Sequence, residues 1–327
     1  MTETWGVRRW NGYVRPEDHG NDAKHDDAAM SVRDSIRALR EVTSHPLNSG
    51  NRVEAVVDYL RWNVGRRIMG GDYILPLADQ ASIIITDQEN FGTLAYACAL
   101  WDFEEMLFLT HLLRPDDLFL DIGANVGGYS ILASNVAGAR SMAFEPVPST
   151  HDRLLRNIRL NNIEDRVRCF RLGIADVEQT LMMTADRGGL NHIISGPCHG
   201  ATIEVPVRRL DDVLGDEPCR LIKLDAEGFE MNVLRGGSHV FGNPNLLALI
   251  VELNGSGDRY GNSDSAVHAE ILRYGFSPYR YDPITRQLSL LETFNRVSLN
   301  TLYVRDLDNT SRILASARKI RVRDRYF

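Results

Sequence analysis

Two carboxylates and a lysine lie close together in the second half of the chain. Lys223, Asp225 and Glu227 belong to the run Ile-Lys-Leu-Asp-Ala-Glu-Gly, whose apolar start predicts a β-strand. Because side chains alternate along a strand, Lys223 and Asp225 should share one face, with Glu227 in the turn that follows. A carboxylate there can remove a proton from a hydroxyl nucleophile. We predict a general base, Asp225 first and Glu227 second; a polar network that only fixes the loop is the alternative.

The same acids are also a candidate metal site. Glu252 ends the next strongly apolar stretch, so its carboxylate can meet those of Asp225 and Glu227 at one edge of a sheet. Hard cations such as Mg²⁺ take carboxylate oxygens. The sequence therefore permits a Mg²⁺ ion at these three residues without requiring one.

A second group of residues predicts a ligand-binding turn. The run Asp-Ile-Gly-Ala-Asn-Val-Gly-Gly, from Asp121 to Gly128, joins an apolar strand to a helix. Glycine lets the backbone turn sharply and approach a ligand, and amides at a helix start favour a negative group. Glu145 ends the next strand, 24 residues after Asp121, where an acid can accept hydrogen bonds from a ribose diol.

The identity of this ligand depends on Asn125. The dinucleotide fingerprint is G-x-G-x-x-G, and Asn125 occupies the position of its second glycine. A side chain there obstructs a pyrophosphate but tolerates a ligand without phosphate. Asp121 suits the ammonium group of a bound amino acid. These details favour S-adenosylmethionine (SAM) over NAD.

The elements that would hold these residues alternate along the chain. Strands are predicted near 118–121, 140–144, 167–171, 221–225, 246–253, 277–281 and 301–304, with helices near 128–136, 149–161 and 266–274. This alternation predicts an α/β fold with a mostly parallel, seven-stranded sheet and helices on both faces. Short strands near 180–184, 192–194 and 202–206 form an insertion around Asp186 to Thr202. Together with the N-terminal cap, this insertion is expected to form the acceptor pocket.

The first part of the chain differs from this pattern. Residues 1–50 are predicted to be an extension, partly flexible from Asn11 to Ala29, with a weak metal candidate in His19, His25, Asp26 and Asp27. Residues 51–115 are predicted to be a cap of helices and one hairpin, including a helix near 53–64 with Val56, Val57, Leu60 and Val64 on one face. Residues 116–327 form the predicted catalytic domain.

Together the three motifs resemble the FkbM family of methyltransferases. The resemblance rests on Asp121–Ser130 (DIGANVGGYS), Phe144-Glu145-Pro146 and Ile222–Glu230 (IKLDAEGFE), and it covers about residues 106–252. It implies a Rossmann-like class I methyltransferase fold, O-methyl transfer and the cofactor SAM. The residues that it implies around SAM are Asp121, Gly123, Ala124, Asn125, Gly127, Tyr129 and Ser130, with Glu145 on the ribose and Asp176 as a weaker candidate for the adenine.

Composition limits the partners. The net charge of −7 over 327 residues disfavours a nucleic-acid substrate, and no apolar run is long enough to span a membrane. Four scattered cysteines and the absence of an apolar leader predict a cytoplasmic protein. Six basic residues between Arg312 and Arg325 are expected to form a solvated tail, or else to attract an anionic substrate. A homo-oligomer is compatible with the sequence.

We therefore expect an enzyme that transfers a methyl group from SAM to a hydroxyl of a sugar or polyketide-type natural product. N-methyl transfer to a small molecule stays open, since an amine needs less help from a base. An NAD-dependent oxidoreductase and a non-catalytic SAM-binding module are the alternatives from other classes.

Overall fold

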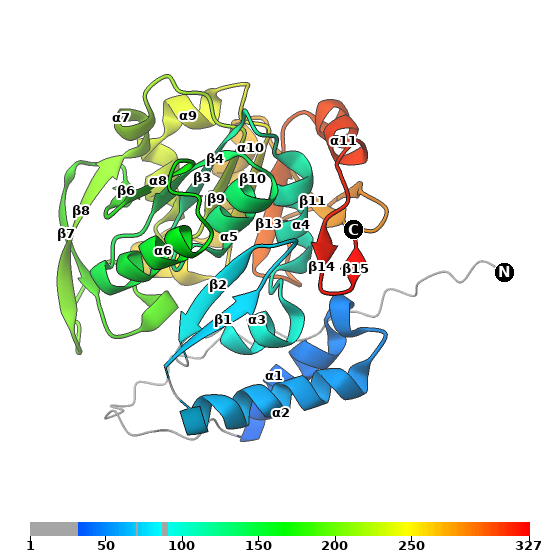
Figure 1. Ribbon diagram of the computed structural model, residues 1–327. Coiled ribbons are helices and arrows are strands. Elements are labelled where there is room, and N and C mark those ends of the chain that lie inside the picture. The colour runs from blue at the N-terminus through cyan, green and yellow to red at the C-terminus, as the bar shows by residue number, and fades with distance from the viewer. Residues whose placement is uncertain (1–31, 70, 87–90) are drawn as a thin grey trace.

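The computed structural model describes residues 32–69, 71–86 and 91–327 (Figure 1). The segment Asn11 to Ala29, with His19, His25, Asp26 and Asp27, lies outside these residues. In the part of the chain that is described, no helix is both long and apolar enough to cross a membrane.

An eight-stranded sheet forms the centre of the molecule. Its order is β12-β11-β13-β10-β9-β3-β4-β5, and the neighbours from β10 to β5 run parallel. The predicted doubly wound sheet is present, and β12 is added as an antiparallel edge strand. The strands are β3 (Leu118–Ile122), β4 (Arg140–Phe144), β5 (Val167–Phe170), β9 (Leu221–Leu224), β10 (Ala248–Glu252), β11 (Ser277–Asp282), β12 (Gln287–Leu290) and β13 (Asn300–Val304).

Helices cover both faces because alternate residues of each central strand point to opposite sides. In β3, Phe119 packs into the core on one face, while Leu118 and Leu120 pack into the core on the other. The first face is covered by α4 (Phe103–Leu112), α5 (Gly128–Ile131), the π-helical turn η2 (Leu132–Val136) and α6 (Pro148–Leu160). The second is covered by α7 (Leu210–Leu214), α8 (Glu230–Gly236), α9 (Ser238–Gly242) and α10 (Asp264–Arg273).

Before the sheet, the chain forms helices and a hairpin. They are α1 (Val32–Ser44), η1 (Pro46–Asn48), α2 (Arg52–Met69), β1 (Asp72–Pro76), β2 (Ser82–Thr86) and α3 (Gly92–Cys98). The hairpin is fastened to α6, since the side-chain amides of Asn157 and Asn161 bond to the backbone of Ile84 and Ser82.

The predicted second helix exists, but its aliphatic face is not the face that is buried. Val57, Leu60 and Val64 are exposed, whereas Tyr59 and Trp62 are buried. The ring of Trp62 lies 4.9 Å from that of Tyr73 and stacks on Tyr96, so two aromatic contacts decide which side of α2 faces the protein. Aliphatic periodicity alone gave no sign of this.

A separate three-stranded sheet, in the order β6-β8-β7, forms the insertion between β5 and β9. Its elements are β6 (Gly173–Ala175), β7 (Gln179–Thr184), η3 (Gly188–Leu190) and β8 (Thr202–Arg209). The strand predicted near His192–Ile194 is reduced to one bridge between Met183 and Ile193. The turn η4 (Ser256–Tyr260) contacts this insertion, because the Tyr260 hydroxyl donates to the Ile193 carbonyl at 2.6 Å.

The C-terminal segment contains α11 (Leu307–Ala315), β14 (Arg321–Val322) and β15 (Arg325–Tyr326). The expectation of a solvated basic tail is wrong here. Arg323 donates to Asp58 Oδ2 at 3.1 Å and to the Ala97 carbonyl at 2.8 Å, and Arg318 donates to the Val136 carbonyl at 2.7 Å. These arginines tie the end of the chain to the cap and to the sheet domain.

Candidate functional site

A cavity opens where β3, β4 and β9 end, beside the point at which the chain switches direction across the sheet. Together with the open solvent at its mouth it spans about 770 Å³, and it lies where ligands bind in sheets of this kind. Of the residues that the sequence singled out, its lining includes Gly123, Asn125, Glu145, Asp225 and Glu227. Three separate sequence motifs therefore meet at one cavity.

The glycine-rich turn has no room for other residues. At Gly123, where φ is +79°, an added Cβ would lie 1.8 Å from the carbonyl oxygen of Asp225. At Gly128 it would lie 2.4 Å from the ring of Trp101, a residue of the N-terminal cap. Such distances are far inside van der Waals contact, so the turn depends on glycine to touch both the β9 loop and the cap.

Asp121, Tyr129 and Ser130 lie outside the residues that line this cavity. Ser130 donates to Asp121 Oδ2 through its amide at 3.1 Å and through its hydroxyl at 2.7 Å. The other carboxyl oxygen of Asp121 is buried without a hydrogen-bond partner in the described structure. A buried acceptor of this kind is costly unless something donates to it.

Glu145 is held in place by the backbone. Its two carboxyl oxygens accept from the amides of Asn125 and Val147 at 3.0 and 2.9 Å. Burial raises the pKa of Glu145 to about 7, although those two amides act in the opposite direction. Each oxygen keeps a lone pair for a further donor in the cavity.

Lys223 and Asp225 form an ion pair at 2.7 Å, on one face as predicted. Burial by itself lowers the pKa of Lys223, but the charges of Asp225, Asp121 and Glu252 outweigh it and raise that pKa above its usual range. Burial raises the pKa of Asp225, yet Lys223 and a hydrogen bond with Glu252 hold it below its usual value. Asp225 is therefore an ionised, already paired carboxylate.

Glu227 is different in two respects. Burial and the neighbouring charge of Asp225 raise its pKa to about 8. Its backbone also adopts a φ of +49°, a region that glutamate rarely occupies, and Gly228 follows with a φ of +97°. Strain of this kind is stored mainly at functional sites, where the surrounding structure enforces it.

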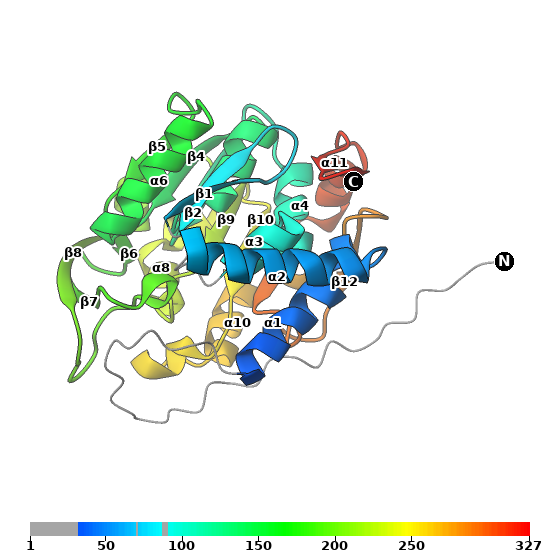
Figure 2. The same cartoon turned by 60° about the horizontal axis from the view of Figure 1, so that its bottom comes forward.

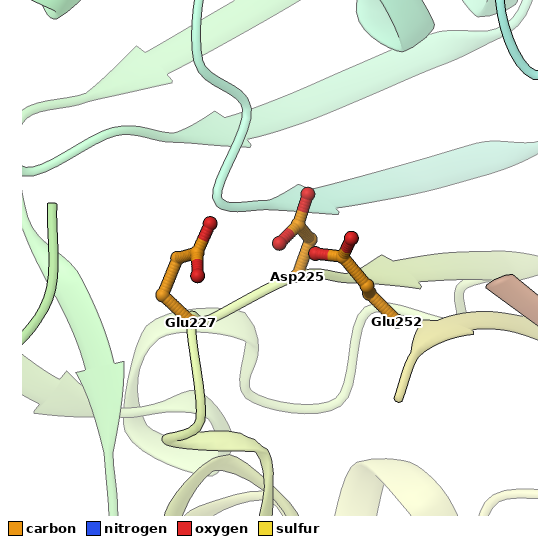
Figure 3. A group of neighbouring side chains, drawn as sticks. All are labelled: Asp225, Glu227 and Glu252. Carbon is orange, nitrogen blue, oxygen red and sulfur yellow. The ribbon is translucent and has the colours of Figure 1, made fainter. Parts of the chain in front are cut away.

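The three acids of the candidate metal site converge, as Figure 3 shows at the ends of β9 and β10. One oxygen from each of Asp225, Glu227 and Glu252 lies within 4.8 Å of the others. Burial and the charge of Asp225 raise the pKa of Glu252 well above its usual value, so a proton on Glu252 relieves the repulsion without a cation. The geometry admits a cation, and protonation is an alternative to it.

Sequence reasoning missed Asp102, which precedes α4. The Tyr129 hydroxyl donates to Asp102 Oδ2 at 2.9 Å, and the ammonium of Lys223 lies 5.1 Å from the centre of the Tyr129 ring. An acid before a helix is ordinarily a cap, so no local signal marked this one. Asp102 links the N-terminal cap to the Lys223 network.

The insertion also reaches the cavity. Its residues in the cavity lining include Gly188, Gly189, Asn191 and Ile193. A Cβ added at Gly189 would lie 3.2 Å from the side-chain amide nitrogen of Asn125. Among the residues that the structure describes, the lining includes none from the cap, which was also expected to contribute to the acceptor pocket. Asp176 lies away from it too, where its carboxylate accepts from Asn232 at 3.1 Å.

Comparison with known proteins agrees with these motifs. Residues 121–278 match the family model described as the methyltransferase FkbM domain. Within these residues the chain is similar to an FkbM methyltransferase domain. The resemblance and the class I methyltransferase fold are thereby confirmed.

The individual relatives share low sequence identity with this chain. "Methyltransferase 1" of Beauveria bassiana is 30% identical over 148 residues, which are 37% of this chain and 59% of that protein. "Hexuronic acid methyltransferase AglP" of Haloferax volcanii is 26% identical over 153 residues, 44% of this chain and 59% of that one. The chain spans 59%, 10% and 61% of the length of the first three curated relatives. A crystal structure of a methyltransferase FkbM from Methylobacillus flagellatus has a TM-score of 0.40 and 16% identity, covering 65% of this chain and 52% of its own.

Proposed function

We propose that the protein is a SAM-dependent O-methyltransferase that acts on a hydroxyl of a sugar or polyketide-type small molecule. The observation that carries this proposal is Glu227, a carboxyl with a pKa of about 8 in the cavity that Glu145 and Gly123 also line. A base with a pKa close to the working pH is suited to removing a hydroxyl proton. An amine acceptor would have less use for it.

The residues present fit SAM. The unpartnered oxygen of Asp121 is an acceptor for an ammonium group, and Glu145 is an acceptor in the cavity for the two ribose hydroxyls. We assign Gly123, Ala124, Asn125 and Gly127 to the backbone that surrounds the methionine part. We assign Tyr129 and Ser130 an indirect role, outside the residues that line the cavity. Ser130 orients Asp121, and Tyr129 bonds to Asp102.

SAM, when bound, supplies a methyl group on a positively charged sulfur. In the proposed reaction the carbon–sulfur bond breaks as a carbon–oxygen bond forms, giving a methyl ether and S-adenosylhomocysteine (SAH). Glu227 accepts the hydroxyl proton, while Lys223 keeps Asp225 ionised beside it. Holding the acceptor in line accounts for much of the expected rate increase.

The acceptor side is proposed to include the insertion, because Gly188, Asn191 and Ile193 line the same cavity as Glu227. Loops on a rigid scaffold commonly set specificity. The name of the Haloferax relative, a hexuronic acid methyltransferase, supports a sugar-type acceptor. Asp176 stays a proposal for adenine recognition, although it lies outside the residues that line the cavity and its Oδ1 already accepts from Asn232.

Asp225, Glu227 and Glu252 are also a proposed Mg²⁺ site, secondary to the base assignment because Lys223 already pairs with Asp225. Activity lost in EDTA and restored by Mg²⁺ would favour the metal site. Activity unaffected by EDTA would favour the proton-sharing arrangement.

Calorimetric titration with SAH tests the cofactor assignment. We expect micromolar binding to the wild type and binding weakened by about 1.5–3 kcal/mol in Glu145→Ala, which loses a charge-assisted hydrogen bond. The matched control is Glu178→Ala, an exposed glutamate that pairs with Arg208 outside the cavity and should leave affinity unchanged. Unchanged affinity in Glu145→Ala would refute the ribose assignment, and binding of NADH instead of SAH would refute the proposed function.

A further inference from the structure

An apolar stripe runs along the outer side of α2. The side chains of Val53, Val57, Leu60 and Val64 are exposed by 75%, 37%, 53% and 54%, and Ile68 extends the stripe at 76%. Single exposed aliphatic residues are ordinary, but a row of this length on one helix marks an interaction site. Figure 2 shows α2 on the outside of the molecule, in front of α3.

The opposite side of α2 already holds the helix in place. Ala55, Tyr59 and Trp62 are buried against α1, α3 and the hairpin, and Asp58 receives a hydrogen bond from Arg323. Within residues 32–69, 71–86 and 91–327, the stripe is the side of α2 that its internal contacts leave uncovered.

The spacing of the stripe is that of a helix pair. Its first four members are separated by four, three and four residues, the repeat with which two helices interlock side chains. The pattern is also symmetric about its middle. When α2 meets a second copy of itself running the other way, Val53 faces Val64 and Val57 faces Leu60. A two-fold dimer needs such a self-complementary surface.

The charges beside the stripe select this antiparallel arrangement. Glu54 and Arg61, both exposed, each follow a stripe residue on the same edge of the helix. In the antiparallel pair, residues on the same edge of the two helices approach one another, so Glu54 of each copy meets Arg61 of the other. A parallel pair would place Glu54 beside Ser49 or Val56, where it has no opposite charge.

We propose that a second copy of this chain covers the stripe through antiparallel pairing of α2 across a two-fold axis. One helix pair buries less area than a standard protein interface, so we expect a dissociation constant in the micromolar range. This proposal is independent of the proposed methyltransferase activity.

Sedimentation of the full chain over a concentration series tests the proposal. The wild type should change from monomer to dimer, and Leu60→Glu should stay a monomer, with the dissociation constant of the dimer raised at least about 100-fold. Ile284→Glu is the matched control, since Ile284 is exposed by 66% in a turn far from α2 in the sequence and should dimerise as the wild type does. A wild type that stays monomeric, or a dimer that persists in Leu60→Glu, would overturn the proposal.

A charge exchange tests the register. Glu54→Arg and Arg61→Glu should each weaken the dimer, because two like-charged pairs form per interface. The double variant should restore it. If the two charges acted only inside their own helix, the losses in stability would instead add in the double variant, since Glu54 accepts a hydrogen bond from Asn51 and Arg61 pairs with Asp58. A double variant that dimerises no better than the single ones would overturn the antiparallel register, and a melting scan of each variant checks that it folds.

Discussion

At the scale of single residues, two neighbouring carboxylates have opposite properties. Asp225 and Glu227 are two positions apart, yet Lys223 keeps the pKa of Asp225 low while burial and Asp225 itself raise that of Glu227 to about 8. An environment that separates two pKa values in this way commonly assigns the roles of acid and base. We therefore propose Glu227 as the base, in preference to Asp225, which the sequence alone had placed first.

The pH–rate profile tests this choice. Only the ionised form of Glu227 can accept a proton, so kcat should rise with pH through about 8. Glu227→Gln should lower kcat by about 10²–10⁴-fold and abolish that rise, with SAH affinity close to wild type. The rate of SAH formation with an acceptor that the wild type methylates is the measurement.

Asp225→Asn is the comparison for that experiment. It removes the partner of Lys223 but leaves Glu227 free to titrate, so the rate should fall while a rise with pH persists. If the rise disappears in Asp225→Asn and persists in Glu227→Gln, then Asp225 is the base.

At the scale of elements, the C-terminal segment contacts helices near the start of the chain. Arg323 donates to Asn48, Ala97 and Asp58, which belong to η1, α3 and α2. Its side chain retains 31% of its exposure, so solvent screens part of the interaction. The larger effect of removing it falls on Asp58, which is buried.

We expect Arg323→Ala to lower the free energy of unfolding by about 1–3 kcal/mol, because it leaves the buried carboxylate of Asp58 with only its longer ion pair to Arg61, at 3.6 Å. Urea unfolding is the measurement. Arg325→Ala is the control, since Arg325 bonds to a single carbonyl, that of Pro46 at 3.1 Å, and should cost less than about 0.5 kcal/mol. Equal losses in the two variants would contradict a special role for Arg323.

At the scale of the whole molecule, buried acids make stability depend on pH. The pKa values of Glu145, Glu227 and Glu230 are raised from 4.5 to about 7, 8 and 7, each first by burial. In the folded state these groups keep protons that the unfolded chain has already released. The contribution of these three acids to the free energy of unfolding is fully present below about pH 4.5 and is lost as the pH rises through 7 to 8.

Burial lowers the pKa of His45 and of His111 to about 4, and these groups act in the opposite direction below pH 6.5. The acids should therefore dominate between pH 6.5 and 8.5. In that window we expect the free energy of unfolding to fall by about 1 kcal/mol for each raised acid. Urea unfolding at several pH values is the measurement. The fall should be smaller in Glu227→Gln. A rise in the free energy of unfolding across the window would contradict the raised pKa values of these acids.

The sequence by itself determined the strand-and-helix alternation and the three motifs. Continuous apolar runs such as Leu118–Ile122 are local signals of buried strands, and Gly123 marks a turn that only glycine can adopt. Because neighbouring parallel strands end at one edge, the order of the strands was enough to predict that Asp225, Glu227 and Glu252 could meet there.

Tertiary structure alone decided the rest, because each remaining feature depends on residues distant in the sequence. The buried side of α2 follows from the aromatic contacts of Trp62, and the partner of Tyr129 is Asp102, 27 positions away. The choice between Asp225 and Glu227 depends on how far each is buried and on which charge lies beside it. Burial and charge proximity are properties of the assembled fold, and no local pattern contains them.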